Sequence, residues 1–149
     1  EILARHLTAD LPLAPAELAG HGGDREATAA SLRRVVVEAL YARNEATAVL
    51  EITEANADTI TSRTLHLADL VSGAMLAAVV SRAKTASIKD ELSGGDGGLS
   101  ADRLRVAVEL EARQNEEIAG ATTPEGWARL IGARTSKILG VRRLGREGI

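Results

Sequence analysis

Almost no aromatic side chain is available to build a core from this sequence. Its 149 residues include one Trp, one Tyr and no Phe, although 45% of the residues are hydrophobic. The core must therefore consist of Leu, Ile, Val and Ala, which suit packing between helices better than a β-sandwich or barrel. We expect a mainly helical protein of about one domain in length.

Helical spacing and helix-end signals recur along the chain. Apolar residues around Val36 fall on one helical face, and Asp24 is a suitable N-cap before them. Thr123 followed by Pro124 is a typical helix start, because Pro is favoured at the first helical position. Helices are therefore predicted over about residues 1–7, 16–19, 24–43, 72–92 and 100–118, and from residue 123 onward.

The hydrophobic period changes between residues 48 and 65. Ala48, Leu50 and Ile52 alternate with other side chains, and residues 59–65 (TITSRTL) are rich in β-branched residues. Residues 54–58 between them form a predicted turn, so the two segments indicate a β-hairpin, to which residues 138–141 add a short strand. The predicted fold class is α+β, a mainly helical bundle with a small sheet. Its expected core residues are Leu32, Val36, Leu40, Leu50, Ile52, Leu76, Val80, Leu104, Val108 and Trp127.

Composition excludes several classes of function. The absence of Cys rules out disulfides, thiolate metal sites and Cys nucleophiles, and a net charge of −3 gives no global attraction to nucleic acid. No apolar run reaches the roughly 18–20 residues that span a bilayer, and no signal peptide is visible, so we expect a cytoplasmic protein. Because the only Met is Met75, we also expect the chain to be a piece of a longer protein.

One long helix is predicted to begin on three small residues, Ser72, Gly73 and Ala74. The first N–H groups of a helix have no partner within it and carry partial positive charge, so they can receive a phosphate or a polar ligand edge. Gly and Ala at this position would let a ligand approach the backbone closely. On spacing alone the alternative stays open, in which Ser72 is a cap and the two small residues only pack against another helix.

Together with the rest of the chain, this helix start resembles the lid subdomain of AAA ATPases. In detail, nearly the whole sequence is similar to the actinobacterial proteasome-associated ATPases of the Mpa/ARC family. The segments that carry the resemblance are residues 7–12 (LTADLP), 50–56 (LEITEAN), 72–75 (SGAM), 81–84 (SRAK), 88–89 (IK) and 122–129 (TTPEGWAR). The resemblance implies that residues 1–149 are an ATPase lid with a family-specific β insertion and a C-terminal extension.

The resemblance also implies a site and a set of partners. Gly73 and Ala74 match the family's lid contact to the nucleoside of ATP or ADP, Ser72 caps the same helix, and His6 matches the adenine-side position. The parent protein would be a hexameric homo-oligomer that unfolds tagged protein substrates for the 20S proteasome. Its lid would sense the nucleotide and contact the next subunit.

The groups that perform phosphoryl transfer are missing from these 149 residues. The sequence contains no G-x-x-x-x-G-K-[ST] loop and no apolar strand ending in paired acids, and the family's arginine fingers would lie before Glu1. Phosphoryl transfer needs a phosphate cradle and magnesium ligands, so this chain alone is expected to be inactive, with Mg²⁺ held by other parts of the parent. We predict no catalytic or metal-binding residue here.

Other functions stay open from the residues alone. The acidic stretch around Glu109 and Glu111 suggests paired carboxylates, although neighbouring Arg residues favour a solvated helix face. His21 and His66 have no convincing metal-ligand partners in the sequence. A basic C-terminal segment suggests nucleic-acid binding, but it lacks interleaved aromatic residues for stacking. Its members are Arg129, Arg134, Lys137, Arg142, Arg143 and Arg146.

A free-standing helical adaptor is the alternative from a different class. It would bind a partner protein through its helices and would have no ATPase domain. The two hypotheses differ in what precedes Glu1 in the gene: an in-frame P-loop for the ATPase lid, and an initiator codon for the adaptor.

Overall fold

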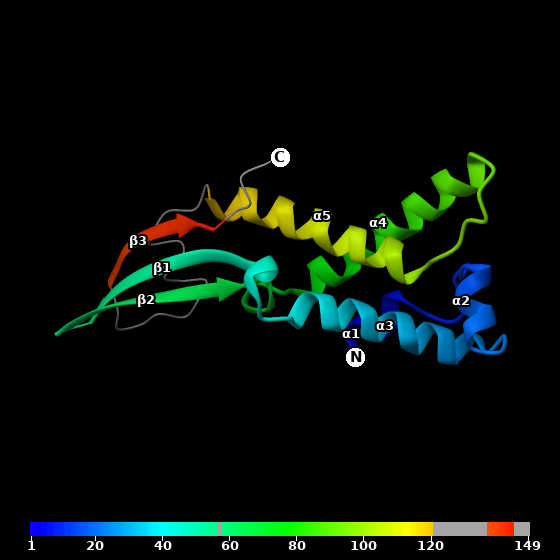
Figure 1. The fold of residues 1–149 in the computed structure, drawn as a ribbon, viewed down its shortest axis with the longest axis horizontal. Helices are drawn as coiled ribbons and strands as arrows, with labels where there is room; N and C mark the ends of the chain where they lie inside the picture. Colours follow the sequence, from blue (N-terminus) through cyan, green and yellow to red (C-terminus); the bar gives the residue numbers. More distant parts are fainter. Residues whose placement is uncertain (57, 121–136, 145–149) are drawn as a thin grey trace. The chain divides into compact units, whose positions relative to one another are not determined.

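The computed structural model describes residues 1–56, 58–120 and 137–144 (Figure 1). The chain divides into two compact units. Unit 1 comprises Glu1–Tyr41 and Val71–Glu111, and unit 2 comprises Ala42–Leu70 and Ala112–Ile149. The predicted α+β class is confirmed, because the described elements are mainly helices together with a small antiparallel sheet.

The helices of the described chain lie close to their predicted positions. They are α1 (Ile2–His6), α2 (Pro15–Gly20), α3 (Arg25–Tyr41), α4 (Gly73–Leu92) and α5 (Ala101–Gly120), with short 3₁₀ turns η1 (Glu45–Thr47) and η2 (Leu67–Asp69). Within the described ranges, no helix is both long and apolar enough to cross a bilayer. The helix start predicted at Thr123 and Pro124 lies outside the described residues.

Side-chain caps fix where the helices begin. Asp24 accepts a hydrogen bond through Oδ1 from the N–H of Ala27 at 3.0 Å, and Ser100 Oγ accepts from the N–H of Arg103 at 3.3 Å. A third cap comes from a distant residue, because Glu17 Oε1 of α2 accepts from the N–H of Ala101 at 2.7 Å. The cap expected at Asp24 is confirmed, and each of these caps satisfies an N–H group that the helix itself leaves unpaired.

Most of the predicted core is buried. The confirmed members are Leu32, Val36, Leu40, Leu50, Ile52, Val80, Leu104 and Val108. The prediction is wrong for Leu76, which is only half-buried, because α4 turns the row of Met75, Val79 and Ala83 inward at helical spacing. Trp127 lies outside the described residues.

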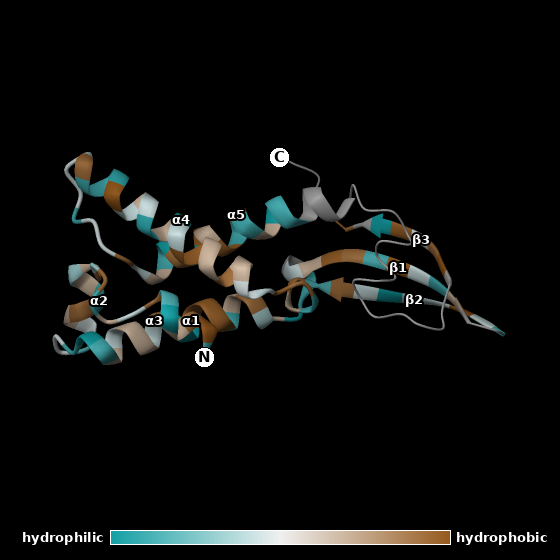
Figure 2. Ribbon diagram, turned by 180° about the vertical axis from the view of Figure 1, so that it is seen from behind, coloured by the Kyte–Doolittle hydropathy of each residue, from teal (hydrophilic) through white to brown (hydrophobic). Residues whose placement is uncertain are grey.

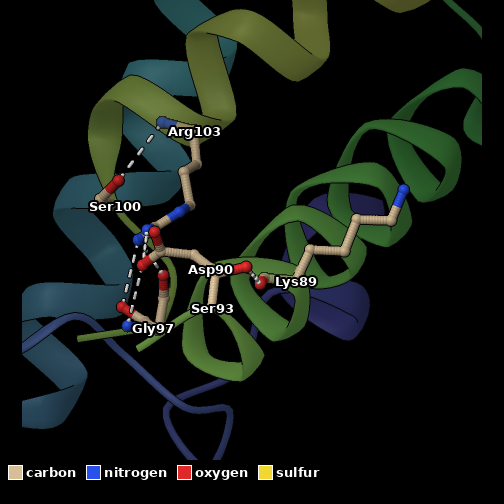
Figure 3. A network of polar contacts seen from close by, with 7 residues as sticks. Lys89, Asp90, Ser93, Gly97, Ser100 and Arg103 are labelled. Carbon is tan, nitrogen blue, oxygen red and sulfur yellow. Dashed lines mark hydrogen bonds and ion pairs between the residues drawn. The ribbon is translucent and has the colours of Figure 1, made fainter. Parts of the chain in front are cut away.

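A glycine-containing loop joins the end of α4 to the start of α5. Arg103 of α5 donates hydrogen bonds to the carbonyl oxygens of Gly97 at 3.1 Å and Gly98 at 2.8 Å, and it pairs with Asp90 of α4 (Figure 3). Asp90 Oδ2 also accepts from the N–H of Gly97 at 3.1 Å. Charge-assisted hydrogen bonds therefore stabilise this helix–helix connection.

A short parallel bridge ties the loop before α2 to the residue that precedes the cap of α5. Leu13 and Leu99 form this bridge, in which the N–H of Ala14 donates to Leu99 O at 2.9 Å and the N–H of Leu99 donates to Pro12 O at 2.8 Å. Leu13 and Leu99 are both buried. The segment that follows the first helix is thus fixed to the loop between α4 and α5.

Unit 2 contains the sheet. Its strands are β1 (Ala48–Asn56), β2 (Thr59–His66) and β3 (Lys137–Arg143), in the order β2-β1-β3 with antiparallel pairing throughout. Figure 2 shows that hydrophilic residues predominate along β2. The predicted hairpin and final strand are both confirmed.

Two details of β1 differ from the prediction. The strand continues through the expected turn to Asn56, which pairs with Thr59, because its last residues face β-branched partners across the hairpin. The strict alternation also fails at the start, where Val49 and Leu50 are both buried and Ala48 is half-buried. A register shift between Ala48 and Leu50 explains this, because an irregular pair lets two successive side chains point inward.

An ion pair closes the base of the hairpin. Arg43 Nη2 lies 2.5 Å from Asp69 Oδ1, and the N–H of His66 donates to Asp69 Oδ2 at 2.9 Å. Burial acts to raise the pKa of Asp69, but the hydrogen bonds from Arg43 and from the His66 backbone outweigh it and hold the pKa below its ordinary value. The ionised carboxylate therefore stabilises the hairpin base.

Acid is expected to destabilise unit 2 through this carboxylate. A lowered pKa in the folded state gives stability that is present above the unfolded pKa, about 4, and is lost as pH falls through the folded value. Asp69→Asn should remove that pH dependence, whereas Asp58→Asn, at an exposed position beside the hairpin turn, should not. Urea unfolding, followed by circular dichroism between pH 2.5 and 6, measures how the free energy of unfolding depends on pH. An equal dependence on pH for both variants would contradict the role of Asp69.

Candidate functional site

The small-residue start of α4 forms as expected. Ser72 has an extended backbone and is the N-cap, with its Oγ accepting a hydrogen bond from the N–H of Met75 at 3.2 Å. Ser72 and Ala74 are exposed and Gly73 is half-buried. The first turn of α4 is thus capped by a hydroxyl and carries no acidic side chain that would compete for its N–H groups.

Helix α1 packs against this helix start. The position where a Cβ of Gly73 would lie is 3.6 Å from Ile2 Cδ1 and 3.8 Å from Ile2 Cγ2, which is ordinary van der Waals contact. A methyl group would therefore fit at Gly73, and its backbone φ is not in the left-handed region. Nothing within the described chain requires glycine here, although glycine costs about 0.5–1 kcal/mol relative to alanine inside a helix.

His6 lies in the last turn of α1 and is exposed. Ile2 and His6 are four residues apart, so both lie on the same face of α1 as neighbours. Because α1 packs against α4 with the Ile2 side chain next to the Cβ position of Gly73, the face of α1 that carries His6 lies beside the start of α4. Ile2 itself is 49% exposed.

Two arginines of α3 hold α1 and the segment after it. Arg33 Nη1 donates to the carbonyl oxygen of Leu7 at 3.0 Å, and Arg25 donates to Ala9 O at 2.8 Å and to Leu11 O at 2.7 Å. Leu7 is fully buried. These contacts satisfy carbonyl groups that the end of a short helix leaves unpaired, and they fix the orientation of the face that carries Ile2 and His6.

Ile2 is the residue of this site that the sequence analysis does not predict. Its position four residues before His6 is the only signal in the sequence, and such spacing occurs in every helix. The structure supplies the missing observation, which is the contact with Gly73.

The acidic stretch on α5 is not a uniform solvated face. Glu109 is exposed as expected, but Glu111 is only 9% exposed and pairs with Arg82 of α4, whose Nε lies 2.8 Å from Glu111 Oε2. The prediction is wrong for Glu111 because α5 places that position between the two helices. Its contact with a cation assigns it to holding α4 and α5 together.

The remaining polar residues of interest have local partners. Nδ1 of His21 lies 3.0 Å from the Glu17 carbonyl oxygen, and Nδ1 of His66 lies 3.3 Å from Thr47 Oγ1. Among the described residues, no group of three His, Asp or Glu side chains is placed to hold a metal ion. In the basic segment, Arg142 pairs with Glu51 across the sheet at 2.5 Å, while Arg129, Arg134 and Arg146 lie outside the described residues.

Comparison with known proteins identifies the class to which this chain is similar. The family model described as ARC, AAA+ ATPase lid domain matches residues 1–148. The proteasome-associated ATPase of Acidothermus cellulolyticus is 40% identical over 150 residues, which cover 99% of this chain and 25% of that protein. That of Geodermatophilus obscurus is 40% identical over 144 residues, covering 97% and 24%. That of Thermobifida fusca is 39% identical over 150 residues, covering 99% and 25%.

The chain therefore spans about a quarter of the length of the curated relatives that it matches. The family model, by contrast, matches nearly the whole of this chain. The resemblance to an ATPase lid is confirmed, and the free-standing adaptor is not favoured: the chain belongs to the family of ARC AAA+ ATPase lid domains.

Proposed function

We propose that this chain is the lid of a larger ATP hydrolase, and that the junction of α1 and α4 contacts the nucleotide. The observation that carries the proposal is the packing of α1 on α4, with Ile2 beside the Cβ position of Gly73, which joins the small-residue start of α4 to the face of α1 that bears His6. Family membership supports it, because the relatives at about 40% identity are named proteasome-associated ATPases.

The chemistry of this junction suits a nucleoside. Ile2 offers an exposed apolar side chain, and the imidazole of His6 offers a flat ring on the same face of α1. Gly73 and Ala74 present backbone N–H groups at the positive end of α4 with no bulky side chain over them. Ser72 Oγ already accepts from Met75 but keeps its own hydrogen for donation to a ribose oxygen.

The parent protein is proposed to be a cytoplasmic, hexameric homo-oligomer that unfolds tagged protein substrates for the 20S proteasome. ATP or ADP would be its cofactor, with Mg²⁺ held by parts of the parent other than these 149 residues. A nucleotide changes the lid's position only if its contacts with the lid differ between two states. The junction residues would supply such contacts, and the lid would also contact the next subunit.

Residues 1–149 are proposed to form one lid subdomain of that longer protein. Within it, unit 1 would be the helical lid, the β1–β2 hairpin would be the family-specific insertion, and the chain after α5 would be the C-terminal extension. The assignment of the hairpin and of β3 to unit 2 supports this division.

Gly73→Val in the full parent protein is expected to weaken nucleotide binding about tenfold, because a branched side chain would cover the first N–H groups of α4. Titration with a fluorescent ADP analogue measures the affinity. Gly73→Ala should bind nearly normally, since a methyl group fits beside Ile2. Gly20→Val, at another helical glycine with open space around it, is the matched control. An unchanged affinity for Gly73→Val would refute the role of this helix start.

A further inference from the structure

The two edges of the sheet in unit 2 differ in how they are protected. In the described sheet, β2 and β3 are the outer strands and β1 is central. The pairing of β3 with β1 has a register irregularity between Thr53 and Glu54, and β3 carries Gly140 and the cations Lys137 and Arg142. A bulge and cations are devices that keep an edge strand from pairing with another chain.

Strand β2 has fewer of these devices, because Arg63 is its only Lys or Arg residue. It pairs with β1 without a register shift from Thr59 to Leu65, and its sequence (TITSRTLH) contains no Gly, Pro or Lys. Every side chain from Thr59 to Thr64 is exposed, and Ile60 is 71% exposed. A regular edge strand presents alternate N–H and C=O groups that point away from its partner, and such groups are a template for one more strand.

Arg63, the one cation of β2, can donate hydrogen bonds to a group other than its neighbour Glu54. Arg63 Nη2 lies 3.6 Å from Glu54 Oε1, which is too long for a hydrogen bond, and its side chain is 53% exposed. Within the described part of the chain, Glu54 Oε1 accepts no hydrogen bond. A second carboxylate approaching from the open side of β2 would therefore meet a guanidinium with N–H groups to donate.

We propose that the outer edge of β2 binds an extended segment of another polypeptide by strand addition. Main-chain hydrogen bonds along residues 59–64 would supply most of the affinity. Specificity would come from β-branched side chains on the incoming strand and from one acidic side chain opposite Arg63. This protein-binding site uses residues of unit 2 alone and is independent of the proposed nucleotide contact.

A peptide series tests the proposal on the unaltered 149-residue chain. The probe is the fluorescein-labelled peptide TVTVDVTV, and the controls carry N-methyl groups on its even or its odd amides. We expect the unmodified probe to bind and to shift the amide NMR signals of residues 59–64, and one of the methylated sets to bind at least about tenfold more weakly. Replacing its Asp by Lys should weaken binding through Arg63.

Two protein variants test whether the probe binds at the edge of β2. Ile60→Lys places a charge on the β2 edge and should weaken binding about tenfold, whereas Ile88→Lys makes the same change at an isoleucine of α4 that is 55% exposed, and should not. If Ile60→Lys alters the circular dichroism spectrum, the methylated peptides decide, because they leave the protein unchanged.

Three results would overturn the proposal. They are no binding of the probe, equal binding of the probe and both methylated peptides, and slow hydrogen exchange of the outward N–H groups of β2 in the free chain. The last result would mean that another part of the chain or a second copy already occupies the edge, and sedimentation would tell these two apart.

Discussion

Gly98→Ala is expected to lower the free energy of unfolding of unit 1 by about 3–4 kcal/mol. Gly98 has a φ of +75°, a left-handed conformation that costs an L-residue roughly 1–2 kcal/mol. A Cβ at this position would also lie 2.5 Å from the backbone nitrogen of Ala14 and 2.6 Å from the carbonyl carbon of Leu13. Backbone atoms cannot rotate away as a side chain can, so the two segments would have to separate.

Separation would break the bridge that the close approach permits. The N–H of Ala14 and the N–H of Leu99 each donate a hydrogen bond across it, at 2.9 Å and 2.8 Å. Overpacking in a tight contact costs about 1–3 kcal/mol, and it adds to the conformational strain. Urea unfolding of the purified chain measures the total.

Gly94→Ala is the matched control, because it introduces the backbone strain of a left-handed conformation without the steric clash of the new Cβ. Gly94 has a φ of +86° in the same loop, but nothing lies within 4 Å of its added Cβ. It is expected to cost only about 1–2 kcal/mol. Equal losses for Gly94→Ala and Gly98→Ala would show that the approach to Leu13 and Ala14 does not matter for stability.

These glycines also show where reading the sequence stops being informative. A loop between the helices predicted over residues 72–92 and 100–118 follows from local composition, which is rich in Gly there. The need for glycine at position 98 arises from Leu13 and Ala14, which lie far away in the sequence and approach only in the folded chain. No local pattern distinguishes Gly98 from Gly94.

Local signals were sufficient for most element boundaries. Asp24 and Ser72 cap helices as predicted, because a cap depends on a side chain and an N–H group only three residues apart. The predicted turn at residues 54–58 was too long, because pairing across the hairpin outweighed the turn preference of Asn56. Pairing partners are not visible in a single segment of sequence.

The candidate site divides in the same way. The start of α4 was predicted from its own residues, and its cap is confirmed. The packing of Ile2 beside the Cβ position of Gly73 joins the two chain segments of unit 1, so it required the fold. Whether His6, Ser72, Gly73 and Ala74 bind nucleotide stays a prediction, which the variants at Gly73 test.

Arg82→Met is expected to lower the free energy of unfolding by about 2–3 kcal/mol. Arg82 Nε donates to Glu111 Oε2 at 2.8 Å between α4 and α5, and the carboxylate side chain is only 11% exposed. Removing one partner of a largely buried ion pair costs about 3–5 kcal/mol when both groups are buried, and less here because Arg82 is 39% exposed. Thermal and urea unfolding measure the loss, and Arg34→Met at an exposed position of α3 controls for the loss of charge.

The double variant Arg82→Met with Glu111→Leu separates the ion pair from simple packing. If Arg82 stabilises the protein mainly by neutralising a carboxylate that α5 holds away from water, removing both charges should recover much of the lost stability, because two apolar side chains then meet between the helices. If Arg82 acts only through its long aliphatic stem, Met already replaces that stem, and the losses of the two single variants should add. Additive losses in the free energy of unfolding would therefore contradict the role of this ion pair in holding α4 and α5 together.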